Sequence, residues 1–477
     1  MLNNLFCFRE HSNIKFSEDI LSYDSINPRI FKISKGVPLY TFHKVRDNDS
    51  FQIKADYYIG IDWLIENKAI IQVEPKVNTA IGSYFNEQTE IEDDQELAIK
   101  DTNQKAKQDI EDTPKEDAIV ELDYLKMLFE VMTHPTSAKH AKDLLLIDWK
   151  KNQIPITQQQ DQLTPFLVVQ FLQLLKQIVR KGLKKSYYPK EENLRGKVKG
   201  KILVGKHLKQ NVFKNRLTST YCSYQVFGED SLENRFLKKV FQFVIMYVGN
   251  HKNVFISIRD EIKLSINFCR PAFEHISTDI DEYSLKHIKN NPFFKEYKEA
   301  VQIGQQLLKK FAYNISKTVE QEVTTPPFWI DMPYLFELYF YAKLLKANPT
   351  DVNQIHFQFS TYGNVLDFLI SKENSPMIID TKYKLHYKWG KVHQDIRQVS
   401  GYARLNKVRK ELKKENSEVI DCLIVYPNLT DFNSLDKIED FSLSNISKQL
   451  SMESNKIKAY HLVYKIGIKL PVIGAVN

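Results

Sequence analysis

The sequence contains little cysteine and little glycine, with 4 Cys and 15 Gly among 477 residues. The cysteines are Cys7, Cys222, Cys269 and Cys422, and they form no CxxC pair and no spacing with histidine that suits zinc. These absences argue against a disulfide framework and against a zinc site. We therefore expect reduced thiols that lie mostly in the protein core.

Long apolar runs are also absent. The longest apolar segment, residues 166–179, is interrupted by three glutamines and is shorter than the ~20 residues that a membrane span requires. The first residues, MLNNLFCFREHSN, lack the basic region and apolar run of a secretory signal. We expect a soluble, cytoplasmic protein without a membrane partner.

The composition is that of a large folded protein, since hydrophobic residues make up 43% and aromatic residues 12% of the chain. A length of 477 residues predicts two or three domains. The phosphate-binding pattern GxxxxGK[ST] does not occur. We therefore expect that this chain binds no nucleotide itself and cannot power movement along a substrate.

Charge is distributed unevenly along the chain. Residues 87–117 hold twelve Asp or Glu and four Lys, so the rest of the chain carries +16 although the whole chain carries +8. We interpret residues 84–118 as an acidic flexible insert or linker, with an acidic docking tail as the alternative. Residues 180–216 hold thirteen Lys or Arg, among them Lys197 and Lys199, and two acids. This stripe suits a phosphate backbone, but a merely solvated basic face explains it equally well.

Hydrophobic patterns divide the rest of the chain into regions. Residues 56–77 predict a β-hairpin, so we expect residues 1–83 to form a small β-rich domain that docks a partner. Apolar residues at helical spacing predict a helical and basic middle region at 119–320. Residues 321–477 predict an α/β domain that opens with a helix over 329–348. The expected fold class is multi-domain α/β (α+β).

Three charged residues interrupt two apolar strands near residue 370. They are Asp367, in NVLDFLI, and Asp380 and Lys382, in MIIDTKYK. Alternation along a strand puts Asp380 and Lys382 on one face and Thr381 on the other. The SKENSP turn lets the strands pair antiparallel, which brings Asp367 beside Asp380. The pattern predicts two carboxylates and an ammonium on one patch of sheet.

Such a patch suits a hard divalent cation, because two adjacent carboxylates repel each other unless a cation lies between them. Mg²⁺, with Mn²⁺ as a substitute, would be held by Asp367 and Asp380. Lys382 could orient or help deprotonate a water and stabilise charge on a phosphate, which predicts phosphodiester hydrolysis. The plainer alternative is an Asp–Lys salt bridge at a sheet edge, which the short string D-x-K alone would favour.

Further residues favour the metal site. Glu337 lies among aromatics in the preceding helix and is a candidate third metal ligand. Gln398 and Tyr402, four residues apart on a basic helix, share a face and could orient Lys382 or contact DNA, although helix packing explains them equally well. The same region supplies cations for DNA binding, which include Arg397, Arg404 and Lys407.

Taken together, these motifs resemble the PD-(D/E)xK nuclease core, and in collinear order they resemble the McrC family, the nuclease subunit of 5-methylcytosine-specific McrBC systems. The matching stretches are IIQVEPKV, LRGKVKGKI, CSYQVFGEDSLENRFLKKVF, IDMPYLFELYF, IIDTKYK and DIRQVSGYA. The resemblance implies catalytic positions for Asp367, Asp380 and Lys382, supported by Gln398 and Tyr402. Leu366 stands where the motif has proline, which supplies no ligand.

The resemblance also implies partners: an McrB-like AAA+ GTPase ring, which moves the DNA and reads the modified base, and double-stranded DNA. On this reading the chain is a defence endonuclease that docks on the ring, stimulates GTP hydrolysis and cuts DNA. Two alternatives stay open, a non-catalytic adaptor of the ring and a stand-alone repair nuclease.

Overall fold

The computed structural model of the chain describes residues 4–10, 12–17, 21–34, 37–47, 50–78, 119–157, 161–280, 295–315, 323–383, 391–415, 417–427, 437–438, 440–457 and 460–473. The chain forms two compact units, one of Met1–Leu163 with Glu322–Asn477 and the other of Thr164–Gln321. The region 119–320, predicted as one middle domain, is thus divided between the two units. The predicted acidic insert at 84–118 lies outside the described residues.

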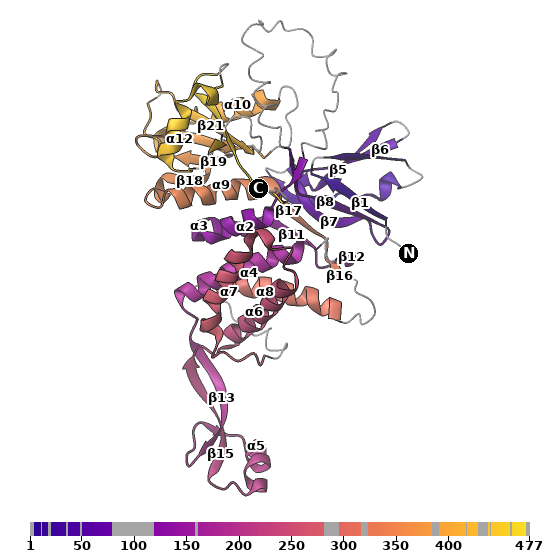
Figure 1. Ribbon diagram of the computed structural model, residues 1–477, viewed down its shortest axis with the longest axis vertical. Coiled ribbons are helices and arrows are strands. Elements are labelled where there is room, and N and C mark those ends of the chain that lie inside the picture. The colour runs from indigo at the N-terminus through magenta and orange to yellow at the C-terminus, as the bar shows by residue number, and fades with distance from the viewer. Residues whose placement is uncertain are drawn as a thin grey trace. The chain divides into compact units, whose positions relative to one another are not determined.

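The N-terminal part of the first unit consists of β-sheets (Figure 1). Its strands are β1 (Asn4–Arg9), β2 (Asn13–Ser17), β3 (Ile30–Ser34), β4 (Val37–Tyr40), β5 (Phe42–Asp47), β6 (Ser50–Ala55), β7 (Tyr58–Ile65), β8 (Ala69–Glu74), β11 (Leu145–Ile147) and β17 (Phe328–Asp331). The main sheet has the order β1-β8-β7-β17-β11, beside a β2-β6-β5 sheet and a β3-β4 pair. The hairpin predicted at 56–77 is confirmed, because β7 and β8 pair antiparallel.

The strand β17 comes from a distant part of the sequence. It pairs antiparallel with β7, with Trp329 opposite Gly60. A Cβ on Gly60 would lie 2.1 Å from the carbonyl oxygen of Phe328, so only glycine permits this approach. The predicted helix over 329–348 was therefore wrong at its start: α9 spans Met332–Ala347. Asp331 ends the strand and caps the helix, since its side chain accepts a hydrogen bond from the backbone N–H of Tyr334.

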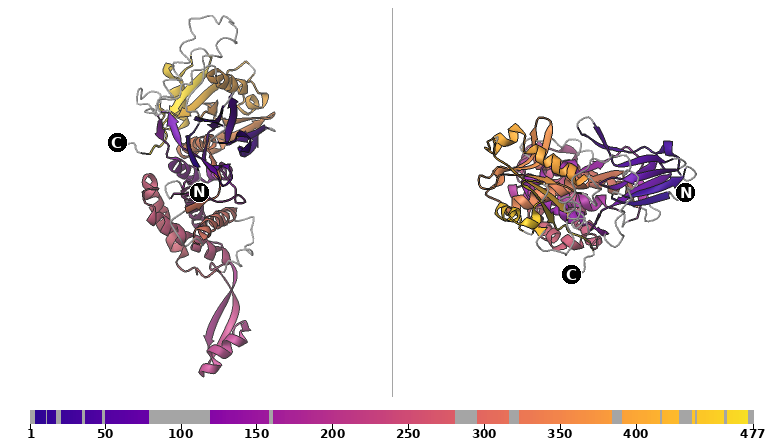
Figure 2. Two further views of the ribbon diagram at one scale, coloured as in Figure 1. Left: turned by 90° about the vertical axis from the view of Figure 1, so that its right-hand side faces the viewer. Right: turned by 90° about the horizontal axis from the view of Figure 1, so that it is seen from above.

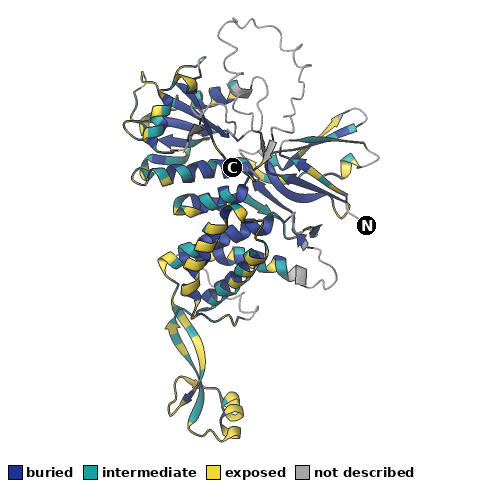
Figure 3. Cartoon of the chain, viewed as in Figure 1, coloured by how far each residue is buried: buried dark blue, intermediate teal, exposed yellow. Residues whose placement is uncertain are grey.

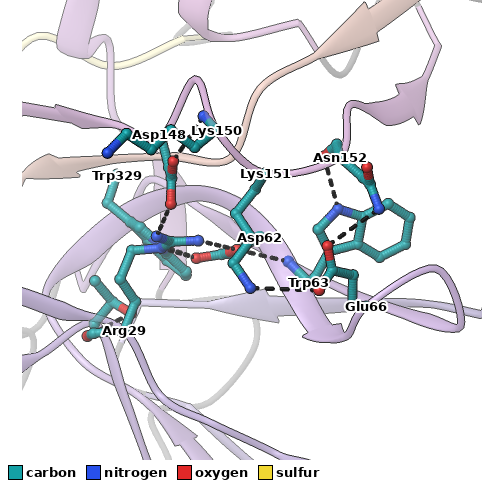
Figure 4. Close-up of polar contacts among 10 residues, drawn as sticks. Arg29, Asp62, Trp63, Glu66, Asp148, Lys150, Lys151, Asn152 and Trp329 are labelled. Carbon is teal, nitrogen blue, oxygen red and sulfur yellow. Dashed lines mark hydrogen bonds and ion pairs between the residues drawn. The ribbon is translucent and has the colours of Figure 1, made fainter.

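A buried polar cluster fixes β17 and β11 to the N-terminal sheet (Figure 4). Arg29 donates to both carboxylate oxygens of Asp62 through Nε and Nη2 and to Asp148 through Nη1, at 2.7 Å for the last. The indole Nε1 of Trp329 donates to the Asp62 carboxylate at 3.0 Å. The Asp62 side chain is 4% exposed, so its charge depends on these donors.

The C-terminal part of the first unit is a six-stranded sheet of order β18-β19-β20-β21-β23-β22. The strands are β18 (Ile355–Thr361), β19 (Asn364–Ile370), β20 (Met377–Thr381), β21 (Asp421–Pro427), β22 (Lys437–Ile438) and β23 (Val463–Ile468). Beside it are the helices α9, α10 (Lys391–Tyr402), α11 (Asn406–Glu411) and α12 (Leu443–Leu450), and α2 (Tyr124–Thr133) and α3 (Pro135–Ala138) pack near α9. The first three strands pair antiparallel and the next pairs are parallel.

Four short strands complete the first unit as two antiparallel pairs. They are β9 (Lys76–Asn78) with β10 (Ile119–Glu121) and β12 (Ile154–Ile156) with β16 (Val323–Thr325). The second pair joins the points at which the chain leaves the first unit and returns to it. The mixed α/β class that we predicted is confirmed for the described part of the chain.

The second unit is a group of helices that carries a β arm. The helices are α4 (Leu163–Lys181), α5 (Val204–Gln210), α6 (Leu232–Asn250), α7 (Arg259–Cys269) and α8 (Lys295–Ile315). The arm consists of β13 (Ser186–Arg195), β14 (Lys201–Ile202) and β15 (Ser219–Gly228), with α5 at its tip, and it extends away from the other helices of this unit (Figure 2). The basic stripe thus lies largely on strands, although we predicted a helical region.

The arm is exposed along most of its length, whereas the helices of this unit bury one face (Figure 3). Two apolar side chains of its tip, Phe213 and Leu217, are 80% and 77% exposed. Among the described residues, no helix is both long enough and apolar enough to span a lipid bilayer.

Candidate functional site

Two strands bring the first two acids together. β19 and β20 pair antiparallel from Phe368 with Ile379 to Ile370 with Met377, which confirms the pairing expected around the SKENSP turn. In the same register the next residues are Asp367 and Asp380, which lie opposite each other where the ladder ends. The charge of Asp367 also acts on Asp380.

Lys382 lies beside Asp380, and α10 supports it. Its Nζ is 2.7 Å from Asp380 Oδ2, and the side chains are 15% and 2% exposed. The same ammonium donates to Gln398 Oε1 at 3.1 Å, and Gln398 Nε2 donates to the hydroxyl of Tyr402 at 2.7 Å. The chain Lys382–Gln398–Tyr402 therefore fixes the direction of the ammonium from one face of α10.

Asp367 is held differently from what strand alternation suggested. Its Oδ2 accepts two hydrogen bonds from Thr381, one from the backbone N–H and one from the hydroxyl, both at 2.7 Å. Strand alternation predicts that Thr381 points away from the charged patch. In the structure it orients one of the acids, and no signal in the sequence distinguished this from ordinary alternation.

A third acid, Glu337 on α9, faces the same group. It is partly buried, and its Oε1 accepts a hydrogen bond of 3.4 Å from Gln358 Nε2. Burial, followed by the charge of Asp367, raises the pKa of Glu337 well above its usual range. Burial and Asp367 likewise raise the pKa of Asp380 to about 7. Clustered acids with raised pKa values are typical of sites that bind cations or transfer protons.

Lys382 is protonated at neutral pH. Burial lowers the pKa of its ammonium, but the charges of Asp380 and Asp367, with Asp395 behind them, outweigh burial and raise the pKa above its ordinary value. A lysine in this state can stabilise negative charge, but it is a poor base. Of the two roles that we considered for Lys382, the raised pKa fits charge stabilisation better than deprotonation of a water.

Sequence reasoning missed two residues beside the site. Asp395 lies buried on α10 and acts electrostatically on both Asp380 and Lys382. The signal was present, because Asp395 opens the stretch DIRQVSGYA. Tyr383, next to Lys382, is buried and donates its hydroxyl to Glu10 at 2.9 Å. That contact ties the strand that bears the lysine to the end of β1, a link that no local pattern could reveal.

The comparison with protein families decides the affiliation of the chain. A family model described as "McrBC 5-methylcytosine restriction system component" matches residues 53–427, which is well over half of the sequence. The chain belongs to this family. The match includes the N-terminal sheet from β6 onward, the second unit and the C-terminal sheet as far as β21.

Two solved structures are similar to this McrBC family chain at low identity. One is a half-complex from a tetradecameric assembly of Thermococcus gammatolerans McrB AAA+ hexamers with bound McrC, at 13% identity and a TM-score of 0.37, covering 99% of this chain and 97% of that chain. The other is the Thermococcus gammatolerans McrBC complex, at 11% identity and a TM-score of 0.26, covering 72% and 88%. No curated protein matches the chain.

The acids of this McrBC family chain are carboxylates, which are the oxygen ligands that a hard divalent cation binds. Asp380 Oδ2 is buried, and the Lys382 ammonium lies 2.7 Å from it, so this carboxylate oxygen already faces a positive charge. Among the described residues, no three His, Cys, Asp or Glu side chains form a ready-made metal cage. Mg²⁺ does not need one, since it usually takes one or two carboxylates together with waters and substrate phosphates.

The predicted DNA-binding residues of this McrBC family chain fall into two groups. Arg397, Arg404 and Lys407 are exposed on or beside α10 and α11, in the unit that holds the acids, and Lys407 donates to the carbonyl of Ser360 at 2.7 Å. Lys197 and Lys199 are exposed between β13 and β14, in the second unit. The Lys199 ammonium lies 4.2 Å from the ring centre of Tyr224.

Proposed function

We propose that this chain is a Mg²⁺-dependent DNA endonuclease subunit of an McrBC-like restriction complex, with a PD-(D/E)xK core in its C-terminal part. The observation that carries this proposal is the meeting of Asp367, Asp380 and Lys382 where the pairing of β19 and β20 ends. The apolar residues of these two strands pack with β21, β23, α10 and α11 in an ordinary core. Membership of the McrBC family supports the role in restriction.

Each residue of the site has a distinct task in this proposal. Asp380, Asp367 and Glu337 are the oxygen donors for the ion, which when bound stabilises negative charge on the scissile phosphate. Lys382 places its ammonium beside the same phosphate and stabilises the extra charge that develops as the phosphodiester is attacked. Gln398 holds that ammonium in place through the 3.1 Å hydrogen bond.

We further propose an McrB-type AAA+ GTPase ring as the partner that supplies movement along DNA in the cytoplasm. The absence of a phosphate-binding loop from the sequence supports this division of labour. Docking requires exposed apolar surface, and the N-terminal part offers Ile30 and Ile33, which are 44% and 70% exposed. The arm of the second unit offers Phe213 and Leu217 as a further surface.

The variant Lys382→Ala tests the proposal. Removing the ammonium is expected to lower DNA cleavage by roughly a hundredfold or more, because charge stabilisation at the reacting phosphate is lost. Stimulation of the ring's GTPase activity should persist, since no docking surface changes. The matched control is Lys372→Ala, which removes a second Asp–Lys pair of the same sheet region, with 2.8 Å between Lys372 Nζ and Asp351 Oδ2.

The outcomes separate the three functions. Cleavage that Lys382→Ala leaves undiminished would refute the nuclease assignment. A wild-type chain that stimulates the ring but cuts no DNA with either Mg²⁺ or Mn²⁺ would indicate an adaptor. Cleavage without any NTPase would indicate a stand-alone nuclease.

A further inference from the structure

The strand β18 changes the face that it presents at Gln358. Phe357 stacks on Tyr341 of α9, with 4.5 Å between ring centres and 7° between planes. Phe359, two residues later, packs instead against the core cluster that contains Ile396 of α10 and Val408 of α11. Residues two apart in a regular strand share a face, so the alternation is broken between these two phenylalanines.

The neighbouring strand changes face at the same point. Phe357 pairs with Phe368, which contacts Phe340 of α9, and Phe359 pairs with Leu366, which belongs to the α10 and α11 cluster. The register is the same on both sides, so no residue has been inserted. Gln358 and Asp367 therefore lie opposite each other at the reversal, between the face of α9 and the face of α10.

Gln358 achieves the reversal with a left-handed backbone. Its φ is +49°. Five other non-glycine residues of the described chain have positive φ, and all five lie in turns, whereas Gln358 lies within a strand. Glycine or asparagine would adopt this conformation at lower cost. The backbone alone therefore does not explain why the position holds glutamine, and strained residues of this kind cluster at functional sites.

The hydrogen bond of the Gln358 side chain explains why this position holds glutamine. The Nε2 of Gln358 donates to Oε1 of Glu337 at 3.4 Å, and Gln358 is exposed. Its backbone lies across from Asp367 in the register of the two strands, so Gln358 neighbours both the α9 acid and the strand acid. Alanine, glycine or asparagine at this position would not reach Glu337 in the same way, because only glutamine has both the amide and the length.

We propose that Gln358 is a positioning residue that acts through Glu337, holding this carboxylate toward Asp367 so that both acids serve one divalent cation. This inference rests on the proposed nuclease function and adds a residue that the charged motif does not contain. The left-handed backbone of Gln358 directs its side-chain amide toward Glu337, and the hydrogen bond from this amide orients the Glu337 carboxylate. Partners of this kind, one step removed from a metal, typically change metal affinity or activity roughly 10- to 100-fold when removed.

Three variants test the proposal. Gln358→Gly removes the amide and relieves the backbone strain, and Gln358→Asn keeps an amide and tolerates the left-handed conformation but is one methylene shorter. The control is Tyr362→Gly, which relieves a similar φ of +47° in the following turn, where Tyr362 is 78% exposed. We measure melting temperature, the kcat and KM of DNA cleavage with the partner ring, and Mn²⁺ binding to the chain by calorimetry.

The expected result is a separation of stability from function. Gln358→Gly and Tyr362→Gly should both melt at or above the wild-type temperature. Gln358→Gly and Gln358→Asn should lose roughly tenfold in kcat with little change in KM, and should bind Mn²⁺ roughly tenfold more weakly, because an acid of the site is no longer held. Tyr362→Gly should leave both quantities unchanged.

Two results would overturn the inference. One is wild-type kcat and Mn²⁺ binding in Gln358→Asn. The other is a Gln358→Gly variant that melts lower and loses activity while Gln358→Asn restores both, because the position would then matter for its backbone alone. If the wild type cuts DNA and Lys382→Ala does not, either result refutes the role of Gln358 without touching the nuclease proposal. A wild type that neither cuts DNA nor binds Mn²⁺ refutes the nuclease proposal itself.

Discussion

Replacing Asp380 by asparagine should stabilise the protein, and more so at higher pH. Burial and the charge of Asp367 raise the pKa of Asp380 to about 7. In the unfolded chain an aspartate titrates at about 3.9. Between these values the folded state binds more protons than the unfolded state, so stability falls as pH rises through this window. Asparagine has nearly the same shape and carries no charge to bury.

The size of the effect follows from the shift. Each pH unit inside the window is worth about 1.4 kcal/mol, so relative to acid pH the folded state loses about 2 kcal/mol of stability by pH 5.5 and about 4 kcal/mol by pH 8. These values are upper limits for the gain of the variant, because Asp380→Asn also removes the carboxylate that pairs with the Lys382 ammonium. Asp367 and Asp395 still act on that ammonium. The advantage of the variant should widen by about 2 kcal/mol between the two pH values and stop growing above pH 7.

Urea unfolding of wild type and variant at pH 5.5 and pH 8, in buffer with a chelator, measures this difference. Asp351→Asn serves as the control, since it removes an aspartate from the Lys372 ion pair away from the site. A variant Asp380→Asn that is less stable at both pH values, or an advantage that does not widen, would refute the reasoning. A stable variant without cleavage activity would instead show that this acid is retained for function at a cost in stability.

Two other substitutions probe the contacts that hold the site and the N-terminal sheet. Thr381→Val removes one of the two hydrogen bonds to Asp367 and should lower cleavage roughly tenfold, with less than about 1.5 kcal/mol lost in urea unfolding; unchanged cleavage would show that the backbone N–H suffices. Arg29→Met leaves the buried Asp62 without its guanidinium and should cost about 3 to 5 kcal/mol, of which the double variant Arg29→Met/Asp62→Asn should recover a part; a loss below about 1 kcal/mol would contradict the electrostatic account.

The sequence predicted local features of the site well. The turn between β19 and β20, the D-x-K string and the Gln398–Tyr402 spacing each depend on residues close in sequence, where strand alternation and helical periodicity apply. The ion pair of Lys382 with Asp380 was foreseen, although as the plainer alternative. The contact of Lys382 with Gln398 is one of the alternatives that the sequence left open for Gln398.

The features that the sequence did not predict depend on irregular strand geometry or on contacts between distant parts of the chain. The face reversal at Gln358 departs from the regular alternation of a strand, so the apolar patterns of IHFQF and NVLDFLI could not predict it. Trp329 and its neighbours look helical by periodicity, yet β7 provides a partner strand that outweighs local preference. The contact of Tyr383 with Glu10 spans 373 positions of sequence, which no pattern in a single segment encodes.

The strand β17 has a consequence for how the molecule can be divided. The chain leaves the first unit, builds the second, and returns to fill a gap between β7 and β11 before it forms α9. A fragment that begins at Met332 would therefore lose the capping carboxylate of its first helix, and the remaining fragment would hold a sheet with a missing member. The half proposed to cut DNA cannot be transplanted alone, so any swap between related systems must exchange the β-rich half along with it.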